Sequence, residues 1–374
     1  MDECITYVGL DVHKRSVVAA MLVRSTGELK EARFERGARG LAKLVRWLAR
    51  EGQGPVRCCY EAGVAGFVLQ RQLEQAGFGC DVVAPSLILR RPGDRRKTDR
   101  RDALKLAEQL ANGQLVAVSP PTSEDEAARA LLRARDDARV VLHQARQRVL
   151  KFLDQQGIPY EGKNWTQKHW HWLRQLRLPV AVAQVVLSET MLAVDQAQQR
   201  LARLDEEVAA LAASECYRVP VGRLCCLRGI STLTAMVILT ELYTFGRFAG
   251  PRALMGFLGL IPSEQSSGER QQTGGITRAG NGYVRRLLTE AAWHYLKAPS
   301  HISRELARRQ AGQPADAVAL AQRAMVRLKK RFHHLLARNK ERNVVATAVA
   351  RELAGWVWAI LQPWVAAEQA VSPA

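Results

Sequence analysis

The sequence predicts an α/β domain followed by an all-α region. Short apolar segments alternate with helical segments over the first 85 residues, which is the pattern of a sheet covered by helices. From residue 124 onward, apolar side chains recur every three or four positions over long stretches. The chain has 374 residues, of which 47% are hydrophobic, enough for two or three folded domains.

Three strands are expected at the start of the chain, at residues 5–12, 16–23 and 30–36. Short turns separate these segments, so the strands should form an antiparallel meander. The following segment, GLAKLVRWLAREG, has apolar residues at helical spacing and ends at Gly52. It should form the first helix.

Strands and helices then alternate. Strands are expected at residues 56–62 and 80–85, with a helix at 67–77 between them. A polar loop leads into another helix, from Asp99 to about Asn112. Three strands followed by this alternation imply a mixed sheet with helices packed on it.

Two long amphipathic stretches follow, at residues 124–154 and 182–213. Their apolar residues come close to a heptad repeat, so they should form an antiparallel hairpin or a coiled coil between subunits. An internal helical bundle would have the same pattern. We expect an N-terminal domain at 1–123, this helical linker at 124–215 and a C-terminal domain at 216–374.

The segment between the two long stretches is rich in aromatic residues, including Trp165, Trp170 and Trp172. His169 and His171 are two residues apart, which would suit two metal ligands on one strand, but no second ligand pair follows. We therefore favour an aromatic and basic surface that stacks on bases or packs on a neighbouring domain.

The C-terminal region begins with LRGISTLTAMVILTEL, a turn at Gly229 followed by an apolar helix. This pattern resembles helix-hairpin-helix units, whose turn amides contact a DNA backbone. Residues 246–282 hold nine of the chain's 27 glycines, so we expect a largely irregular, functional segment there. Helices are expected at 283–296, 315–336 and 348–362.

The charge of the chain favours polyanionic partners. It has 55 Lys and Arg residues against 36 Asp and Glu, a net charge of +19, and a sequence pI near 10.1. Nucleic acid is the leading candidate, although a solvated basic surface would have the same composition. Residues 86–101 alone hold seven basic and two acidic residues.

The cysteine pattern predicts a reducing compartment. Seven cysteines are present, and Cys58 with Cys59 and Cys225 with Cys226 are adjacent pairs. Neither pair has the spacing of a redox or zinc motif, so we expect reduced core residues and a cytoplasmic protein. We find no apolar run of membrane-spanning length and no signal segment, and we expect no membrane partner.

One aspartate, Asp11, stands in the apolar strand YVGLDV. A buried carboxylate is costly unless a cation or hydrogen-bond donors accompany it, and Glu61, Asp99 and Asp102 are candidate companions. Four carboxylates at one sheet edge would suit Mg²⁺ and phosphoryl transfer. Alternatively, Asp99 is a helix N-cap, Asp102 completes a capping box, and Glu61 is an ordinary charge at a strand end.

The segments YVGLDVHK, CYEAG and KTDRRDALKLA resemble the RuvC-like domain, an RNase H fold, of the DEDD transposases of insertion sequences. That family includes the Piv and MooV DNA invertases and is described as bridge-RNA-guided recombinases. A second block, from LRGISTLTA to GGITRAGNGYVRRLLTEAA, resembles its C-terminal transposase domain. The resemblance implies that Asp11, Glu61, Asp99 and Asp102 are the metal-binding and catalytic tetrad. The HWHW segment matches no motif of the family.

The resemblance also implies a serine nucleophile in the segment that follows GLIP and ends in SG. Ser267, just before Gly268, is the matching residue, and Ser266 and Ser263 are its neighbours. A serine hydroxyl needs a base or a metal for activation, so it should work beside the tetrad, and the resemblance implies that the two come from different subunits. A turn serine in a glycine-rich loop is the alternative.

We therefore expect a bacterial recombinase that cuts and rejoins DNA strands. The implied partners are donor DNA, target DNA and a guide RNA, and the implied assembly is a homo-oligomer, a dimer or tetramer, that works on the nucleoid. One alternative is a Holliday-junction or structure-specific endonuclease that uses the tetrad alone. Another is a nucleic-acid-binding protein without catalysis.

Overall fold

The chain folds into two compact units, Met1–Thr122 and Ser123–Ala374, in a computed structural model. The structure describes residues 5–63, 65–85, 88, 98–267, 270–297 and 302–371. Each unit is described by itself below. The expected division into three domains, at 1–123, 124–215 and 216–374, remains a prediction.

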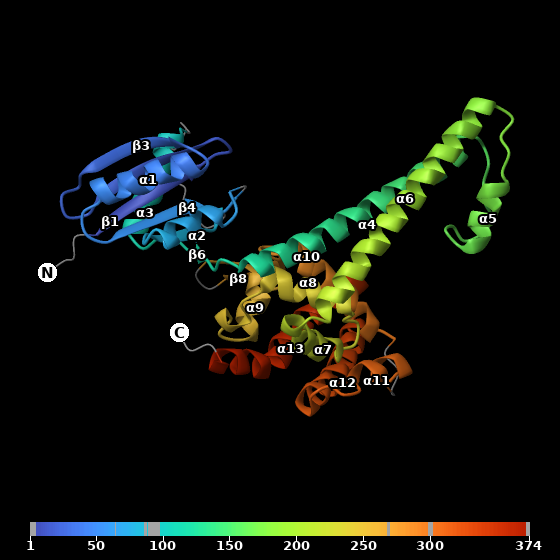
Figure 1. The fold of residues 1–374 in the computed structure, drawn as a ribbon. Coiled ribbons are helices and arrows are strands. Elements are labelled where there is room, and N and C mark those ends of the chain that lie inside the picture. The colour runs from blue at the N-terminus through green and yellow to red at the C-terminus, as the bar shows by residue number, and fades with distance from the viewer. Residues whose placement is uncertain are drawn as a thin grey trace. The chain divides into compact units, whose positions relative to one another are not determined.

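The first unit is built on one six-stranded mixed sheet of order β3-β2-β1-β4-β5-β6 (Figure 1). β1, β2 and β3 form the antiparallel meander, β4 and β5 run parallel to β1, and β6 is antiparallel to β5. This mixed α/β arrangement agrees with the RNase H-like expectation, and the short β6 was not predicted. The strands are β1 (Thr6–Val12), β2 (Ser16–Val23), β3 (Leu29–Glu35), β4 (Val56–Glu61), β5 (Gly79–Val83) and β6 (Ala117–Val118).

Helices cover both faces of this sheet. The expected helices are α1 (Ala38–Glu51), α2 (Val68–Gln75) and α3 (Asp99–Ala111). α1 and α2 pack on the face that holds Leu10 and Tyr60. α3 packs on the opposite face, against Tyr7 and Cys59. Because strand side chains alternate between faces, the residues of β1 with odd numbers, including Asp11, belong to the side of α3.

Gly9 lets α3 approach β1 closely. A Cβ atom at this position would collide with the carbonyl oxygen of Ala103 and would lie 2.6 Å from the backbone nitrogen of Ala107. The two elements therefore touch backbone to backbone, and any larger residue would push them apart. The sequence places this glycine two residues before Asp11.

The second unit begins with two long helices, α4 (Ser123–Gln155) and α6 (Ala181–Ala212), which lie side by side and antiparallel (Figure 1). The expected hairpin is therefore present within one chain, and a coiled coil between subunits remains a prediction. At its far end α5 (Gln167–Gln175) folds back, and the aromatic segment joins a core shared by α4 and α6.

The disfavoured alternative of two histidine ligands on one strand is excluded, because His169 and His171 lie on α5. Residues two apart on a helix point in different directions and cannot share a metal ion. His169 is buried, and its Nδ1 accepts a hydrogen bond from the backbone N–H of Trp165 at 3.1 Å. Burial lowers the pKa of His169, so this ring is a neutral packing element.

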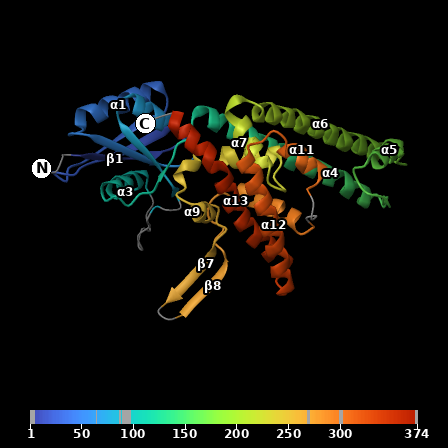
Figure 2. The ribbon, with the colours of Figure 1, turned by 90° about the horizontal axis from the view of Figure 1, so that it is seen from below.

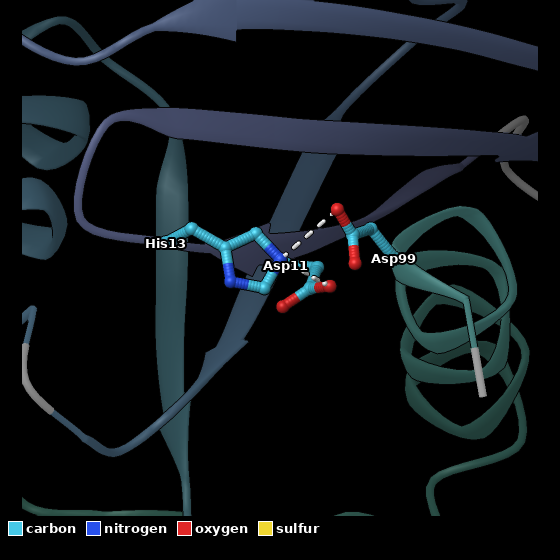
Figure 3. A group of neighbouring side chains, drawn as sticks. All are labelled: Asp11, His13 and Asp99. Carbon is cyan, nitrogen blue, oxygen red and sulfur yellow. Dashed lines mark hydrogen bonds and ion pairs between the residues drawn. The ribbon is translucent and has the colours of Figure 1, made fainter.

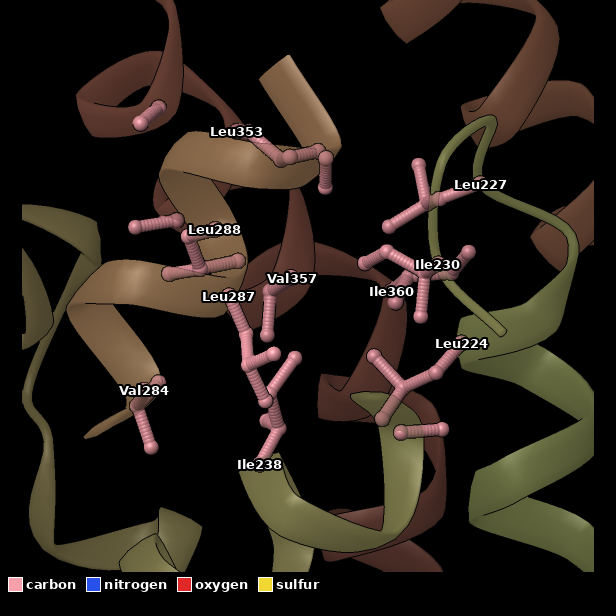
Figure 4. Close-up of a cluster of buried hydrophobic side chains, with 14 of the residues drawn as sticks. Leu224, Leu227, Ile230, Ile238, Val284, Leu287, Leu288, Leu353, Val357 and Ile360 are labelled. Atoms are coloured by element: carbon pink, nitrogen blue, oxygen red, sulfur yellow. The ribbon is translucent and has the colours of Figure 1, made fainter. Parts of the chain in front are cut away.

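The remaining helices surround the largest core of the molecule (Figure 4). Ile238 on α8, Leu288 on α10 and Val357 on α13 meet in it. The helix-hairpin-helix likeness of α7 and α8 remains a prediction. The elements are α7 (Glu215–Cys225), α8 (Thr232–Leu242), α9 (Pro251–Phe257), α10 (Gly282–Ala292), α11 (Arg304–Gln310), α12 (Ala315–Ala337) and α13 (Arg342–Val371), with 3₁₀ turns η2 (Phe245–Arg247) and η3 (Trp293–Tyr295).

The glycine-rich region 246–282 is more regular than expected. Besides α9 it contains the antiparallel hairpin of β7 (Pro262–Ser267) and β8 (Arg270–Ile276), which extends away from the helices of its unit (Figure 2). Two of the glycines allow backbone segments to cross at its base. Gly259 and Gly280 have φ angles of 63° and 67°, and a Cβ on Gly280 would collide with the carbonyl oxygen of Phe257.

The expectation that the chain has no apolar run of membrane-spanning length is wrong. One helix meets that test, which considers only length and composition. Residues Arg342–Ala367 of α13 are long and apolar enough for a span. Half of the apolar window is buried inside the unit, against helices such as α12 and α10. Core packing therefore accounts for its composition.

The expectation of buried thiols holds for five of the six cysteines in the described ranges, and Cys216 is exposed. All six are free. Burial raises the pKa of Cys58 to about 12, which makes its thiol unreactive at neutral pH.

We expect Gly9→Ala to destabilise the first unit by at least about 2 kcal/mol, because the added methyl group separates α3 from β1. Gly79→Ala is the matched control, since a Cβ at Gly79 in β5 meets nothing within 4 Å. Urea unfolding followed by far-UV circular dichroism measures both variants. Equal stability of the two would contradict the packing argument.

Candidate functional site

The end of β1 carries the central carboxylate of the site. The side chain of Asp11 is 19% exposed. The last paired residues of the parallel strands β1 and β4 are Leu10 and Tyr60, so Asp11 and Glu61 are the next residues on neighbouring strands. Strand alternation assigns both to the face that α3 covers. The side chain of Glu61 is exposed.

The N-terminus of α3 brings two further carboxylates to this edge. Thr98 is the N-cap, and its hydroxyl accepts a hydrogen bond from the N–H of Arg101 at 3.4 Å. The alternative roles for the aspartates as helix caps are therefore wrong. Asp99 is the first helical residue, and Asp102 is the fourth, one residue beyond the position that a capping box requires. Because Thr98 caps the helix, neither carboxylate is needed for that purpose.

His13 lies between two of these carboxylates (Figure 3). Its Nε2 is 3.1 Å from an Oδ atom of Asp11 and 3.3 Å from an Oδ atom of Asp99. One ligand atom from each of the three residues lies within 4.8 Å of the others, a possible metal-binding group. His13 was not among the expected site residues, although its spacing of two from Asp11 at a strand end is a usable signal.

The acidic groups repel one another. Burial is the main reason that the pKa of Asp11 is raised, and the negative charges of Asp99 and Asp102 raise it further. The hydrogen bond and charge of His13 act in the opposite direction. The negative charge of Asp102 therefore acts on Asp11 as well. A bound cation would remove this repulsion, so the site has the electrostatics of a metal centre.

The structure thus brings together Asp11, His13 and Asp99, whereas Asp102 is linked to Asp11 only through its charge. Glu61 follows Tyr60 at the same sheet edge but is not in the three-residue group. Ser267 belongs to the second unit, where it ends β7. Ser263, one of its neighbours, uses its hydroxyl to donate to the carbonyl oxygen of Gly275 at 3.1 Å.

The predicted basic loop lies mostly outside the described residues, including Arg90, Arg91, Arg95, Arg96 and Lys97. Its last two arginines are described and lie on the first turn of α3. Arg100 forms an ion pair with Glu31, whereas the side chain of Arg101 is exposed. Positive charge therefore borders the acidic site.

Comparison with known proteins supports a transposase. A family model described as Transposase, of the DEDD type of IS110 elements, matches residues 8–158, and the model Transposase IS116/IS110/IS902 family matches residues 222–307. A putative transposase, y4qE, of Sinorhizobium fredii is 40% identical over 95% of this chain and 88% of its own length. The transposase of insertion sequence element IS1533 from Leptospira borgpetersenii is 36% identical over 90% of this chain and 98% of its own length.

We expect Asp11→Asn to raise the thermal midpoint of the metal-free protein, because the ionised form of a carboxylate with a raised pKa is disfavoured in the folded state. The same change should abolish the rise in midpoint that divalent cations cause in the wild type. Differential scanning fluorimetry with EDTA, Mg²⁺ or Mn²⁺ measures both effects.

Asp81→Asn is the matched control for this experiment. Asp81 lies on the same sheet but pairs with Arg57 at 2.9 Å, so its variant should keep the stabilisation by metal. A metal response of Asp11→Asn equal to that of wild type would exclude Asp11 as a ligand.

Proposed function

Because the chain belongs to the IS110 family of insertion-sequence transposases, we propose that its DNA transposase activity uses Asp11, Glu61, Asp99 and Asp102 as a metal-binding tetrad. The convergence of Asp11 with Asp99 carries this proposal, since these carboxylates are 88 positions apart in the sequence and meet across α3 and β1. Structural packing alone gives no reason to gather repelling charges.

The donors present fit Mg²⁺. The four side chains offer carboxylate oxygens, which are the ligands this ion prefers. When bound, the ion supplies charge stabilisation to the attacking and leaving oxygens of a phosphodiester. His13 offers nitrogen, a poorer ligand for Mg²⁺, so we assign it to holding the carboxylates of Asp11 and Asp99 in position.

We propose Ser267 as the nucleophile of strand transfer. Attack of its Oγ on a backbone phosphorus would form a serine–DNA ester and release a hydroxyl at the other DNA end. Attack on that ester by a hydroxyl of another strand would release Ser267 and rejoin the DNA. Each step exchanges one phosphate ester for another, so no external energy source is required.

Three observations support this assignment. Ser267 ends β7, and the β7–β8 hairpin extends away from the helices of its unit (Figure 2). The hydroxyl of Ser263 is already bound to the backbone of the hairpin. Ser267 also holds the position of the resemblance, immediately before Gly268. We propose that Ser267 acts beside the tetrad of another subunit in a homo-oligomer, a dimer or tetramer.

The partners that we propose are donor DNA, target DNA and a structured guide RNA, on the bacterial nucleoid and without a membrane. The net charge of +19 supports a large polyanionic partner. Family membership supports DNA, and the guide RNA rests on the resemblance of the motifs.

We expect Ser267→Ala to reduce strand exchange by at least about 1,000-fold and to abolish covalent protein–DNA adducts, because no other group replaces the nucleophile. Ser266→Ala should keep both activities. A plasmid recombination assay and a denaturing gel of the adducts measure the outcome. Full recombination by Ser267→Ala would favour an endonuclease-like reaction at the tetrad with water as nucleophile.

We expect the protein purified at low salt to carry one discrete small RNA. Extraction and sequencing identify it, and digestion with RNase but not DNase should remove the nucleic acid. Recombination should then depend on adding the RNA back. A heterogeneous mixture of cellular RNA, or recombination without any RNA, would contradict the guided mechanism.

A further inference from the structure

His13 lies on the tight turn between β1 and β2, two residues beyond Asp11. Its backbone N–H donates to the carbonyl oxygen of Ser16 at 2.8 Å, which closes the turn. The carbonyl oxygen of Arg15 accepts a hydrogen bond from the N–H of Arg36 at 3.0 Å, so the turn is also tied to the end of β3. The backbone that carries the imidazole ring is therefore held from two sides.

His13 is the only basic side chain that contacts the carboxylates of Asp11 and Asp99 in the described part of the chain. A lysine or arginine in this place would neutralise a carboxylate and offer nothing to a metal ion. An imidazole nitrogen can either donate a hydrogen bond or offer a lone pair, and histidine is the commonest metal ligand in proteins. The basic group at this site is thus of the kind that also binds metals.

The distances from His13 to the two carboxylates match the spacing of ligands around one ion (Figure 3). Nε2 of His13 lies 3.1 Å from Oδ2 of Asp11 and 3.3 Å from Oδ2 of Asp99. In octahedral sites with metal–ligand distances of about 2.1 Å, adjacent ligand atoms are about 3 Å apart. Ligand atoms of the three residues lie within 4.8 Å of one another, so an imidazole nitrogen is available as a third ligand.

The three-residue group is open to solvent. The side chains of His13 and Asp99 are 45% and 47% exposed, whereas that of Asp11 is 19% exposed. A hydrated cation therefore reaches the imidazole and the outer carboxylate without any unfolding of the unit. Water or a phosphate oxygen can fill the remaining coordination positions.

A donor set with nitrogen favours a different ion from a set of carboxylates alone. Mg²⁺ prefers oxygen ligands and keeps its waters rather than exchange them for nitrogen. Transition metals accept imidazole, and Mn²⁺ combines this ability with the preference for carboxylates and octahedral geometry that Mg²⁺ has. His13 therefore allows the site to discriminate between two ions that the acidic residues treat similarly.

We propose that His13 is a direct nitrogen ligand of Mn²⁺ at this site and gives the site a preference for Mn²⁺ over Mg²⁺. This inference rests on the proposed function, because it requires the tetrad to bind a divalent cation. With Mg²⁺, His13 keeps the positioning role assigned above. With Mn²⁺, the ring carries its proton on Nδ1 and offers the lone pair of Nε2 in place of its hydrogen bonds to the carboxylates.

Electron spin echo spectroscopy of the full-length protein loaded with Mn²⁺ detects this ligand, because a coordinated nitrogen nucleus modulates the echo. We expect the modulation in wild type and its loss in His13→Gln. The position is exposed, and the amide N–H of Gln can still donate to a carboxylate, so this variant separates ligation from positioning. His143→Gln is the matched control, since His143 is exposed on α4, and it should keep the signal.

Isothermal titration calorimetry with Mn²⁺ alone and with Mg²⁺ alone measures the preference. We expect His13→Gln to weaken Mn²⁺ binding by about tenfold or more and to leave Mg²⁺ binding nearly unchanged. Thermal melting in EDTA confirms that the variants are folded. Equal weakening of both ions would overturn the proposal, because it would show that His13 only positions the carboxylates. Bound Mn²⁺ in wild type without nitrogen modulation would overturn it too.

Asp11→Asn distinguishes a failure of this inference from a failure of the proposed metal site. If wild type binds neither ion, or if Asp11→Asn binds both ions as wild type does, the tetrad is not a metal site and both proposals are overturned. If Asp11→Asn loses both ions while His13→Gln behaves as wild type does, only the role of His13 is overturned.

Discussion

The contact between α3 and β1 at Gly9 is the constraint on which the candidate site depends. Without a side chain at Gly9, the backbone of the helix rests on the strand. The helix then begins beside the end of the strand, and Asp99 meets Asp11 there. A separation of even a methyl group would change the distance between the two carboxylates, so packing in the core determines the geometry at the sheet edge.

Electrostatics make this arrangement costly for the folded chain. Asp11 is largely buried, which raises its pKa, and the negative charges of Asp99 and Asp102 raise it further. His13 relieves part of the repulsion. Because Thr98 caps α3, Asp99 and Asp102 are not used to cap the helix. The chain as a whole carries a net charge of +19. A protein with these charges can hold a metal ion at one edge and a nucleic-acid backbone around it.

The second unit uses a buried ion pair to hold its helices together. Glu241 on α8 is 2% exposed, and it is bound by Arg133 on α4 and by Asn281, whose Nδ2 donates at 2.7 Å. Asn281 also caps α10. A buried carboxylate is tolerated only with such partners. Because β8 leads directly into this cap, the network anchors the base of the hairpin that carries Ser267.

The sequence by itself determined the family, the two long helices α4 and α6, and the type and order of the elements of the first unit except β6, because apolar periodicity and motifs are local signals. It did not show the β7–β8 hairpin, since strands rich in glycine and polar residues lack that periodicity, and glycines that allow backbones to cross resemble those of loops. Only the tertiary structure decided which side chains meet. Asp11 and Asp99 converge, and His13 joins them, because Gly9 allows a helix and a strand that are distant in the sequence to pack in direct contact.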